Sequence, residues 1–265
     1  MNACQGLLRE RVDRGDVLVF GTLIEMRTPA VIEAFAHAGY DAVLIDREHS
    51  AFNDETVMEH IRVARCLGLP SMVRVCEDCY HEMNRTLDQA PDGIFIPRIR
   101  SREQVEQIMR TVRYPPRGLR GLAGSTCPIG KYIGWKSTAE QIETVNRNLV
   151  VGVQIETAEA LADLDGILSV EGLDIALVGG DDLSMSMGIP GQTQSPEFLA
   201  AVERVIEACG RHGVLPGIAS TDPQRTAAWI GKGMKVIWYA CEIAILWQSL
   251  IERRQALRSA LGESR

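Results

Sequence analysis

Eight short apolar runs rich in β-branched residues alternate along the chain with amphipathic helical stretches. The runs are residues 17–24, 42–48, 71–75, 93–99, 150–156, 173–181, 215–220 and 235–242. They are too continuously apolar to expose one face to water, which is typical of parallel strands covered on both sides. Eight strand–helix repeats of this kind predict an α/β fold, a single closed (β/α)8 TIM barrel.

The length agrees with one barrel domain spanning residues 1–265, because 265 residues with 46% hydrophobic content can bury one large core. No linker divides the chain. Asp54 and Ser101 occupy predicted N-cap positions before helical apolar spacing. Residues 114–149 are Pro- and Gly-rich at their start and helical at their end, so we expect an elaborated loop that covers the active site.

Composition excludes several classes of protein. The formal net charge of −7 argues against a general nucleic-acid or anionic-membrane surface. The chain has no apolar run long enough to span a bilayer and no signal-peptide pattern, so we expect a cytoplasmic protein. Seven cysteines in such a chain indicate reduced thiols, and the pair Cys76 and Cys79 lacks the second pair that a zinc ribbon needs.

Ionisable side chains gather at the carboxyl ends of the predicted strands, where barrels of this type collect their chemistry. The second strand ends in "LIDREHS", which contains Asp46, Arg47, Glu48 and His49. The other strand ends carry Arg74, Arg98, Gln154, Glu156, Gly180, Asp181 and Asp182. Independent surface charges have no reason to concentrate at one end of a barrel, so this set predicts an active site.

The residue types in this set suit enolate chemistry. Two carboxylates on neighbouring strand ends, Glu156 and Asp182, leave coordination positions open for water and substrate, which suits Mg²⁺ or Mn²⁺ acting as a Lewis acid. Arg74 offers a planar cation for a carboxylate or enolate oxygen, and His49 can transfer protons near neutral pH. No lysine ends a predicted strand, which disfavours a Schiff-base aldolase.

Five motifs in order resemble the HpcH/HpaI aldolases, the metal-dependent pyruvate aldolases, over nearly the whole chain. They are "GYDAVLIDREHS", "MVRV", "RYPPRGLRG", "VQIET" and "DDLSMSMGIPG". The resemblance implies Glu156 and Asp182 as metal ligands, Arg74 as the group that binds the pyruvyl oxygen, and His49 with Asp46 as the base and its partner. Gln154, Gly180 and Asp181 adjoin these positions and are expected to contact the substrate.

The same resemblance implies an assembly. Asp88 stands where family members carry an aspartate that reaches a neighbouring subunit's site. Family members are typically hexamers, trimers of dimers that exchange a C-terminal helix, which would account for the apolar Ile245, Leu246 and Trp247 near the end of the chain.

Two arginines depart from the family pattern. Arg47 replaces the usual glycine between Asp46 and Glu48, and Arg98 stands where many relatives have an apolar residue. Each is expected either to bind an additional substrate carboxylate or to form an ion pair at the barrel rim, for instance with Asp181 or Glu48.

Three functions remain open on the sequence. The first is an aldolase that joins or cleaves pyruvate, or a related 2-oxo acid, and an aldehyde through an enolate with Mg²⁺ or Mn²⁺. The second is a citrate-synthase-like enzyme that condenses oxaloacetate with an acyl donor, as in siderophore assembly, which Arg47 and Arg98 favour. The third is a catalytically silent binding or regulatory barrel, against which the presence of His49, Arg74, Glu156 and Asp182 argues.

Overall fold

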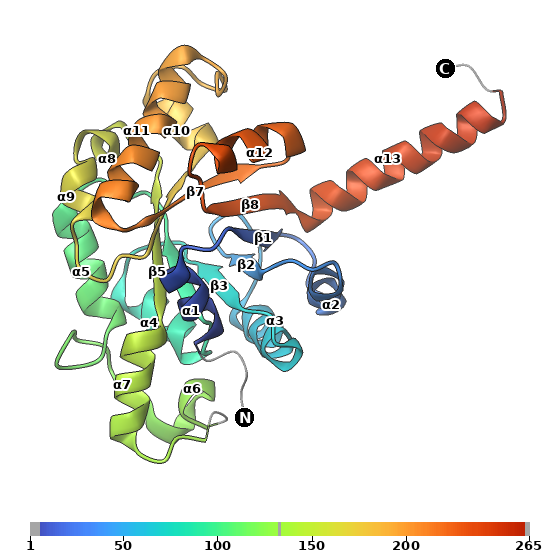
Figure 1. Ribbon diagram of the computed structural model, residues 1–265. Helices are drawn as coiled ribbons and strands as arrows, with labels where there is room; N and C mark the ends of the chain where they lie inside the picture. The colour runs from blue at the N-terminus through green and yellow to red at the C-terminus, as the bar shows by residue number, and fades with distance from the viewer. Residues whose placement is uncertain (1–5, 132–133, 263–265) are drawn as a thin grey trace.

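The computed structural model describes residues 6–131 and 134–262 and confirms the predicted barrel (Figure 1). Eight parallel strands follow one another in sequence order around a closed sheet, and β8 pairs with β1. The strands are β1 (Leu18–Leu23), β2 (Ala42–Asp46), β3 (Ser71–Arg74), β4 (Gly93–Ile96), β5 (Val150–Ile155), β6 (Ile175–Val178), β7 (Leu215–Ser220) and β8 (Val236–Cys241). All eight predicted runs contain a strand.

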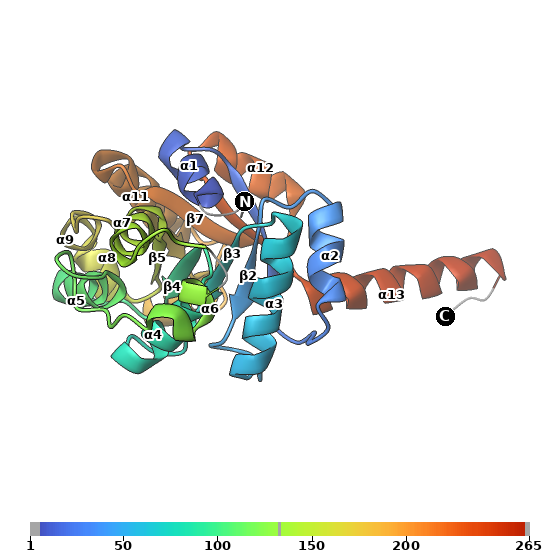
Figure 2. The same ribbon diagram turned by 90° about the horizontal axis from the view of Figure 1, so that it is seen from below.

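The helices surround the barrel, as the view from below shows (Figure 2). They are α1 (Leu7–Arg14), α2 (Ala30–His37), α3 (Asp54–Leu67), α4 (Tyr80–Asp88), α5 (Arg102–Val112), η1 (Gly124–Thr126), α6 (Pro128–Lys131), α7 (Thr138–Asn148), α8 (Ala158–Ala162), α9 (Leu164–Leu168), α10 (Gly180–Ser186), α11 (Pro196–His212), α12 (Pro223–Gly231) and α13 (Glu242–Ala260). Ser101 caps α5 as predicted, with its side chain accepting from Gln104 N, whereas Asn53 and not Asp54 caps α3.

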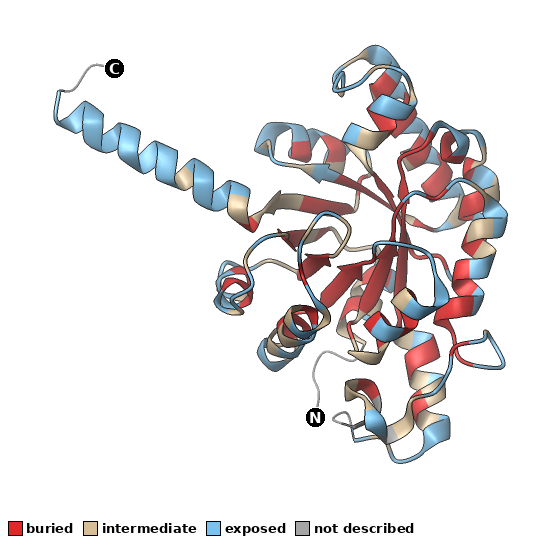
Figure 3. Cartoon of the chain, turned by 180° about the vertical axis from the view of Figure 1, so that it is seen from behind, coloured by how far each residue is buried: buried red, intermediate tan, exposed pale blue. Residues whose placement is uncertain are grey.

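The interior of the barrel is a packed core rather than a channel. Phe20, Met72, Phe95 and Trp238 belong to one buried cluster that draws on most of the strands. Leu8 of α1 joins this cluster, so the N-terminal helix closes the end of the barrel opposite the carboxyl ends of the strands. Figure 3 shows the strands almost wholly buried, which is the arrangement that continuous apolar runs require.

Residues 114–149 form η1, α6 and α7 and pack along α4. The Gly121 N–H donates to the Tyr80 hydroxyl at 3.1 Å, and the buried Arg120 guanidinium pairs with Asp88 at 3.0 Å. Tyr114 and Ile129 belong to a small apolar cluster of their own in this segment. Within one chain the segment therefore supports α4, and the covering of an active site remains a prediction.

Helix α13 projects away from the barrel and is exposed along nearly its whole length (Figures 1 and 3). Its exposed apolar side chains include Leu246, Trp247, Leu250 and Leu257, and Trp247 is 67% exposed. Within the described residues, none of the helices combines the length and apolar character needed to cross a membrane.

Candidate active site

Arg74 and Asp46 form the centre of the barrel mouth. They are direct partners across β2 and β3, so both side chains leave the sheet at its carboxyl end. Arg74 Nε donates to Asp46 Oδ1 at 2.8 Å and Arg74 Nη2 donates to Asp46 Oδ2 at 2.6 Å, a bidentate pair in which both residues are buried. Such a pair fixes the plane of the guanidinium as well as its position.

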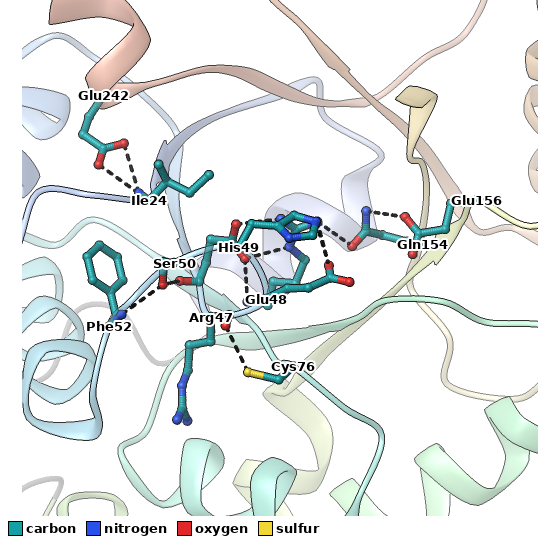
Figure 4. Close-up of polar contacts among 12 residues, drawn as sticks. Ile24, Arg47, Glu48, His49, Ser50, Phe52, Cys76, Gln154, Glu156 and Glu242 are labelled. Carbon is teal, nitrogen blue, oxygen red and sulfur yellow. Dashed lines mark hydrogen bonds and ion pairs between the residues drawn. The ribbon is translucent and has the colours of Figure 1, made fainter. Parts of the chain in front are cut away.

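Gln154, on β5, connects this pair to Glu156, which follows the last residue of the strand. Its side-chain carbonyl accepts from Arg74 Nη1 at 3.1 Å, and its Nε2 donates to Glu156 Oε2 at 3.0 Å. Because a strand turns alternate residues to the same side, Gln154 and Glu156 both face the mouth. Figure 4 shows the two side chains meeting there.

The backbone at Arg98 and at Gly179 holds the Glu156 carboxylate in place. Arg98 has a positive φ of 57°, and its N–H donates to Glu156 Oε1 at 2.6 Å. Gly179 packs against the other oxygen, since a Cβ there would lie 2.4 Å from Glu156 Oε2. The glycine that follows β6 is therefore needed for the close approach of its backbone to this carboxylate.

Glu48, for which the sequence predicts no catalytic or metal-binding role, also belongs to the site. It is largely buried, and its Oε2 lies 3.0 Å from Arg74 Nη1. That ion pair is not aligned as a hydrogen bond, so among the described residues Glu48 Oε2 is a buried atom with no hydrogen-bond partner. Its spacing two residues after Asp46 was the signal, because alternate residues face the same way.

The mouth carries an excess of negative charge. Burial, together with the neighbouring Glu48 and Asp182, raises the pKa of Glu156 to about 7 against the opposing effects of the Arg98 N–H and Arg74. Burial also raises the pKa of Glu48, with Asp46 and Asp182 contributing in the same direction. These acids lie in one another's field with Arg74 as the buried cation among them, which is an arrangement that a bound cation would stabilise.

His49 lies at the open side of this cluster. Its side chain is 59% exposed, and its Nε2 lies 3.9 Å from Glu48 Oε2. Both oxygens of Asp46 are occupied by Arg74, and Oδ1 also accepts the Glu48 N–H at 2.9 Å. The expected pairing of His49 with Asp46 is therefore not formed, and Glu48 is the acid closest to the imidazole.

Arg47 points away from the mouth (Figure 4). Its guanidinium pairs with Asp54 at 3.0 Å and with Glu82 at 3.0 Å, between α3 and α4. The expectation of a rim ion pair is confirmed with different partners from those named above. The alternative expectation, that Arg47 binds an additional substrate carboxylate, does not fit this direction of the side chain, because β2 ends at Asp46 and the guanidinium is held by Asp54 and Glu82.

The remaining candidate residues differ in how close they lie to the centre. Asp182 belongs to the first turn of α10 rather than to a strand, because β6 already ends at Val178. Gly180 and the exposed Asp181 begin the same helix and line a cavity of the mouth. The Arg98 side chain is exposed, and within the described residues no ion pair involves it.

Asp88 lies apart from this cluster. It ends α4, and its carboxylate is held by Arg120. In the described part of the chain the cysteines form no disulfide, and Cys76 Sγ–H donates to the Arg47 carbonyl at 3.0 Å; Cys4 lies outside the described residues.

The comparisons with known proteins identify the family. The family model described as HpcH/HpaI aldolase/citrate lyase matches residues 20–246. The chain belongs to this family. A hydroxypyruvate/pyruvate aldolase of Paraburkholderia phytofirmans is 30% identical over 258 residues, which cover 95% of this chain and 97% of the relative. A 4-hydroxy-2-oxo-heptane-1,7-dioate aldolase of Escherichia coli is 30% identical over 214 residues, which cover 81% of this chain and 80% of the relative.

Solved structures of HpcH/HpaI proteins have the same fold. An HpcH/HpaI aldolase from Desulfitobacterium hafniense superposes with a TM-score of 0.89 at 28% identity, covering 95% of this chain and 96% of that one. The citrate synthase SbnG superposes with a TM-score of 0.85 at 30% identity, covering 97% of this chain and 99% of that one. The predicted family and the predicted carbon–carbon lyase class are thus confirmed.

Proposed function

We propose that this HpcH/HpaI family member is a divalent-metal-dependent aldolase that cleaves or forms a carbon–carbon bond between pyruvate, or a related 2-oxo acid, and an aldehyde. The observation that carries the proposal is the bidentately held Arg74, with Glu48 paired to it and Glu156 joined to it through Gln154, while Asp182 is near enough to Glu48 and Glu156 to raise the pKa of both. The names of the aldolase relatives support the donor, since pyruvate or hydroxypyruvate appears in the first of them.

Glu156 and Asp182 are the residues that would hold Mg²⁺ or Mn²⁺. Carboxylate oxygens are the ligands that these hard cations prefer, and two of them leave positions for substrate oxygens. The pKa of Glu156, raised to about 7, and the unpaired oxygen of Glu48 are the features of this chain that fit a cation. When bound, the metal supplies Lewis acidity to the 2-oxo acid.

Arg74 would orient the donor and stabilise the oxygen that becomes negative. A guanidinium has five N–H groups, and the hydrogen bonds to Asp46 and Gln154 use three of them. Of the two that remain, the one on Nη2 is available to a substrate oxygen. Because Asp46 fixes the guanidinium plane, this donor is already in place before the enolate forms.

His49 would transfer the proton of the acceptor half. In the cleavage direction the hydroxyl next to the breaking bond gives its proton to the imidazole while the bonding electron pair moves to the donor half as an enolate. The methyl carbon of pyruvate then takes up a proton. The exposure of His49 allows water to relay these protons, and the Glu48 carboxylate lies 3.9 Å from its Nε2.

A second candidate function is condensation of oxaloacetate with an acyl donor. Two observations favour it: the likeness to the citrate synthase SbnG at 30% identity, and the exposed Arg98 side chain beside the mouth. With Arg47 turned outward, one additional arginine rather than two is available for a further carboxylate. The aldolase is therefore the first choice.

The assembly that we propose is a homohexamer, a trimer of dimers, in which α13 packs on a neighbouring subunit and Asp88 reaches a neighbouring site. The exposed apolar residues of α13 support it, since such a stripe is costly in water. Truncation before Trp247 should lower the oligomeric order in size-exclusion chromatography. An unchanged elution volume would contradict the role of the helix.

The function is tested by assaying cleavage and condensation with pyruvate and oxaloacetate against a panel of aldehydes and acetyl-CoA. EDTA should abolish turnover, and Mg²⁺ or Mn²⁺ should restore it for the wild type but not for Glu156→Ala or Asp182→Ala. Exchange of the pyruvate methyl protons with solvent deuterium, followed by NMR, isolates enolate formation from the choice of acceptor. Full activity of a metal-free preparation would contradict the proposal.

A further inference from the structure

A cavity of about 450 Å³ occupies the half of the mouth opposite His49 and Glu48, over the ends of β6, β7, β8 and β1. Gly180 and Asp181, next to the proposed ligand Asp182, line one side of it, and Phe198, Trp229 and Trp238 supply aromatic walls. Its volume is in the range of ligand pockets, which are mostly apolar with a few polar groups. A molecule in this cavity would adjoin the reaction centre without displacing the donor from Arg74.

Trp238 is the residue shared by the cavity and the reaction centre. It projects from β8 into the barrel interior and is 6% exposed. The Arg74 guanidinium carbon lies over its ring, 5.3 Å from the centroid, and the Phe95 ring meets it edge-on with centroids 5.0 Å apart. The indole thus supports the face of Arg74 by a cation–π contact, and Trp238 is also one of the residues that line the cavity.

The indole N–H is the polar group at this position. Among the described residues Trp238 Nε1 is a buried atom with no hydrogen-bond partner. A buried donor left without a partner destabilises the folded protein. Phenylalanine would keep an aromatic face for Arg74, with a weaker cation–π attraction, and would bury no donor. The ring accounts for the contact with Arg74, and the N–H is the donor that the contacts of the described residues leave unused.

We infer that Trp238 is a specificity-determining residue whose N–H donates to an oxygen of the carbonyl acceptor bound in this cavity, while its ring positions Arg74 for the donor. The inference rests on the proposed aldolase function and adds to it the place of the acceptor. It assigns the two halves of the mouth to the two halves of the product: donor at Arg74 and Glu156, acceptor along β6, β7 and β8.

Two substitutions of Trp238 separate the effect of the indole N–H on the acceptor from the effect of the ring on Arg74. Trp238→Phe removes the donor and keeps an aromatic face for Arg74, so kcat/KM for the acceptor should fall about tenfold while pyruvate proton exchange keeps most of its rate. Trp238→Ala also removes the ring, and exchange should then fall by about fivefold or more because Arg74 loses its support. Tyr239→Phe is the matched control, since it removes one hydroxyl from the adjacent residue, which packs on the outer side of β8.

The outcomes are distinguishable. Equal losses of acceptor kcat/KM and proton exchange in Trp238→Phe, or no loss in either, would overturn the hydrogen bond to the acceptor. Unchanged exchange in Trp238→Ala would overturn the positioning of Arg74. Circular dichroism and thermal unfolding of each variant identify a loss that comes from misfolding. Absence of pyruvate exchange in the wild-type enzyme would instead contradict the proposed function itself.

Discussion

Both ends of the barrel contain acids paired with arginines, but at the mouth the neighbouring acids also raise one another's pKa. At the N-terminal end, Asp41 accepts the Val19 N–H at 2.7 Å and pairs with Arg11 at 2.7 Å. Asp174 likewise accepts the Val151 N–H at 2.8 Å, and Arg9 binds both of its oxygens. Each of these carboxylates joins neighbouring strands and has a cation of its own.

At the mouth the acids outnumber the cations that contact them. Arg74 contacts both Asp46 and Glu48, and Glu156 has only N–H donors for partners. The comparison teaches that buried charge alone does not mark a functional site in this molecule. What distinguishes the mouth is that its acids raise one another's pKa, a cost in stability that active sites commonly carry.

The largest expected effect compares the arginines of the two ends. Arg74→Lys keeps the charge but loses the bidentate geometry, so kcat should fall by about 100-fold or more, the scale for one lost oxyanion donor. Arg9→Lys breaks an equally good pair at the other end and should leave kcat unchanged while it lowers the free energy of unfolding by about 1–3 kcal/mol.

Steady-state kinetics and urea unfolding on both variants check this contrast. A fall confined to KM in Arg74→Lys would make Arg74 a ground-state binder rather than a group that acts in the transition state. A large loss of kcat in Arg9→Lys would break the distinction between a structural and a functional end.

A smaller effect concerns the pH dependence of stability. Burial raises the pKa of Asp92, at the N-terminal end, from 3.8 to about 7, and burial with the neighbouring acids raises that of Glu156 from 4.5 to about 7. In both cases the folded protein keeps a proton that the unfolded chain has lost at intermediate pH. The free energy of unfolding therefore contains a contribution that is present below the unfolded pKa and is lost as the pH rises to about 7.

The shifts correspond to a decrease of up to about 3 kcal/mol for Glu156 and about 4 kcal/mol for Asp92. Urea unfolding across this pH range, on the wild type and on Glu156→Gln and Asp92→Asn, measures the two contributions. Saturating Mg²⁺ should remove the part that depends on Glu156 and leave the part that depends on Asp92. A Mg²⁺ effect of equal size in Glu156→Gln would show that the cation binds elsewhere.

The fold and the centre of the candidate site could be predicted because they follow from local rules. Continuous apolar runs identify buried parallel strands, and in a barrel their carboxyl ends must meet, so Arg74, Gln154 and Glu156 were placed correctly in the mouth. Side-chain direction beyond a strand end does not follow from such rules. Arg47 and His49 come after the last residue of β2, where backbone turning and nearby partners decide the direction.

Trp238 illustrates a different limit. A large aromatic residue inside a barrel strand predicts a core position, and Trp238 does belong to the buried core cluster. Its missing hydrogen-bond partner and its contact with Arg74 depend on atoms contributed by β3 and β4, far away in the sequence. No pattern in the chain reports them.

The smallest expected effect tests whether a residue beside the mouth can behave like those of the opposite end. Arg47 stands directly after Asp46, yet its guanidinium pairs with Asp54 and Glu82 and joins α3 to α4. Arg47→Gln should therefore lower the free energy of unfolding by about 1–2 kcal/mol, as expected for a partly buried ion-pair network. Since the side chain faces away from Gln154 and Glu156, kcat/KM for mono-, di- and tricarboxylate substrates should be unaffected. Glu82→Gln and the double variant complete a double-mutant cycle whose coupling energy isolates the ion pair. A selective loss of kcat/KM for polycarboxylates, with stability unchanged, would instead return Arg47 to the substrate pocket and strengthen the citrate-synthase-like alternative.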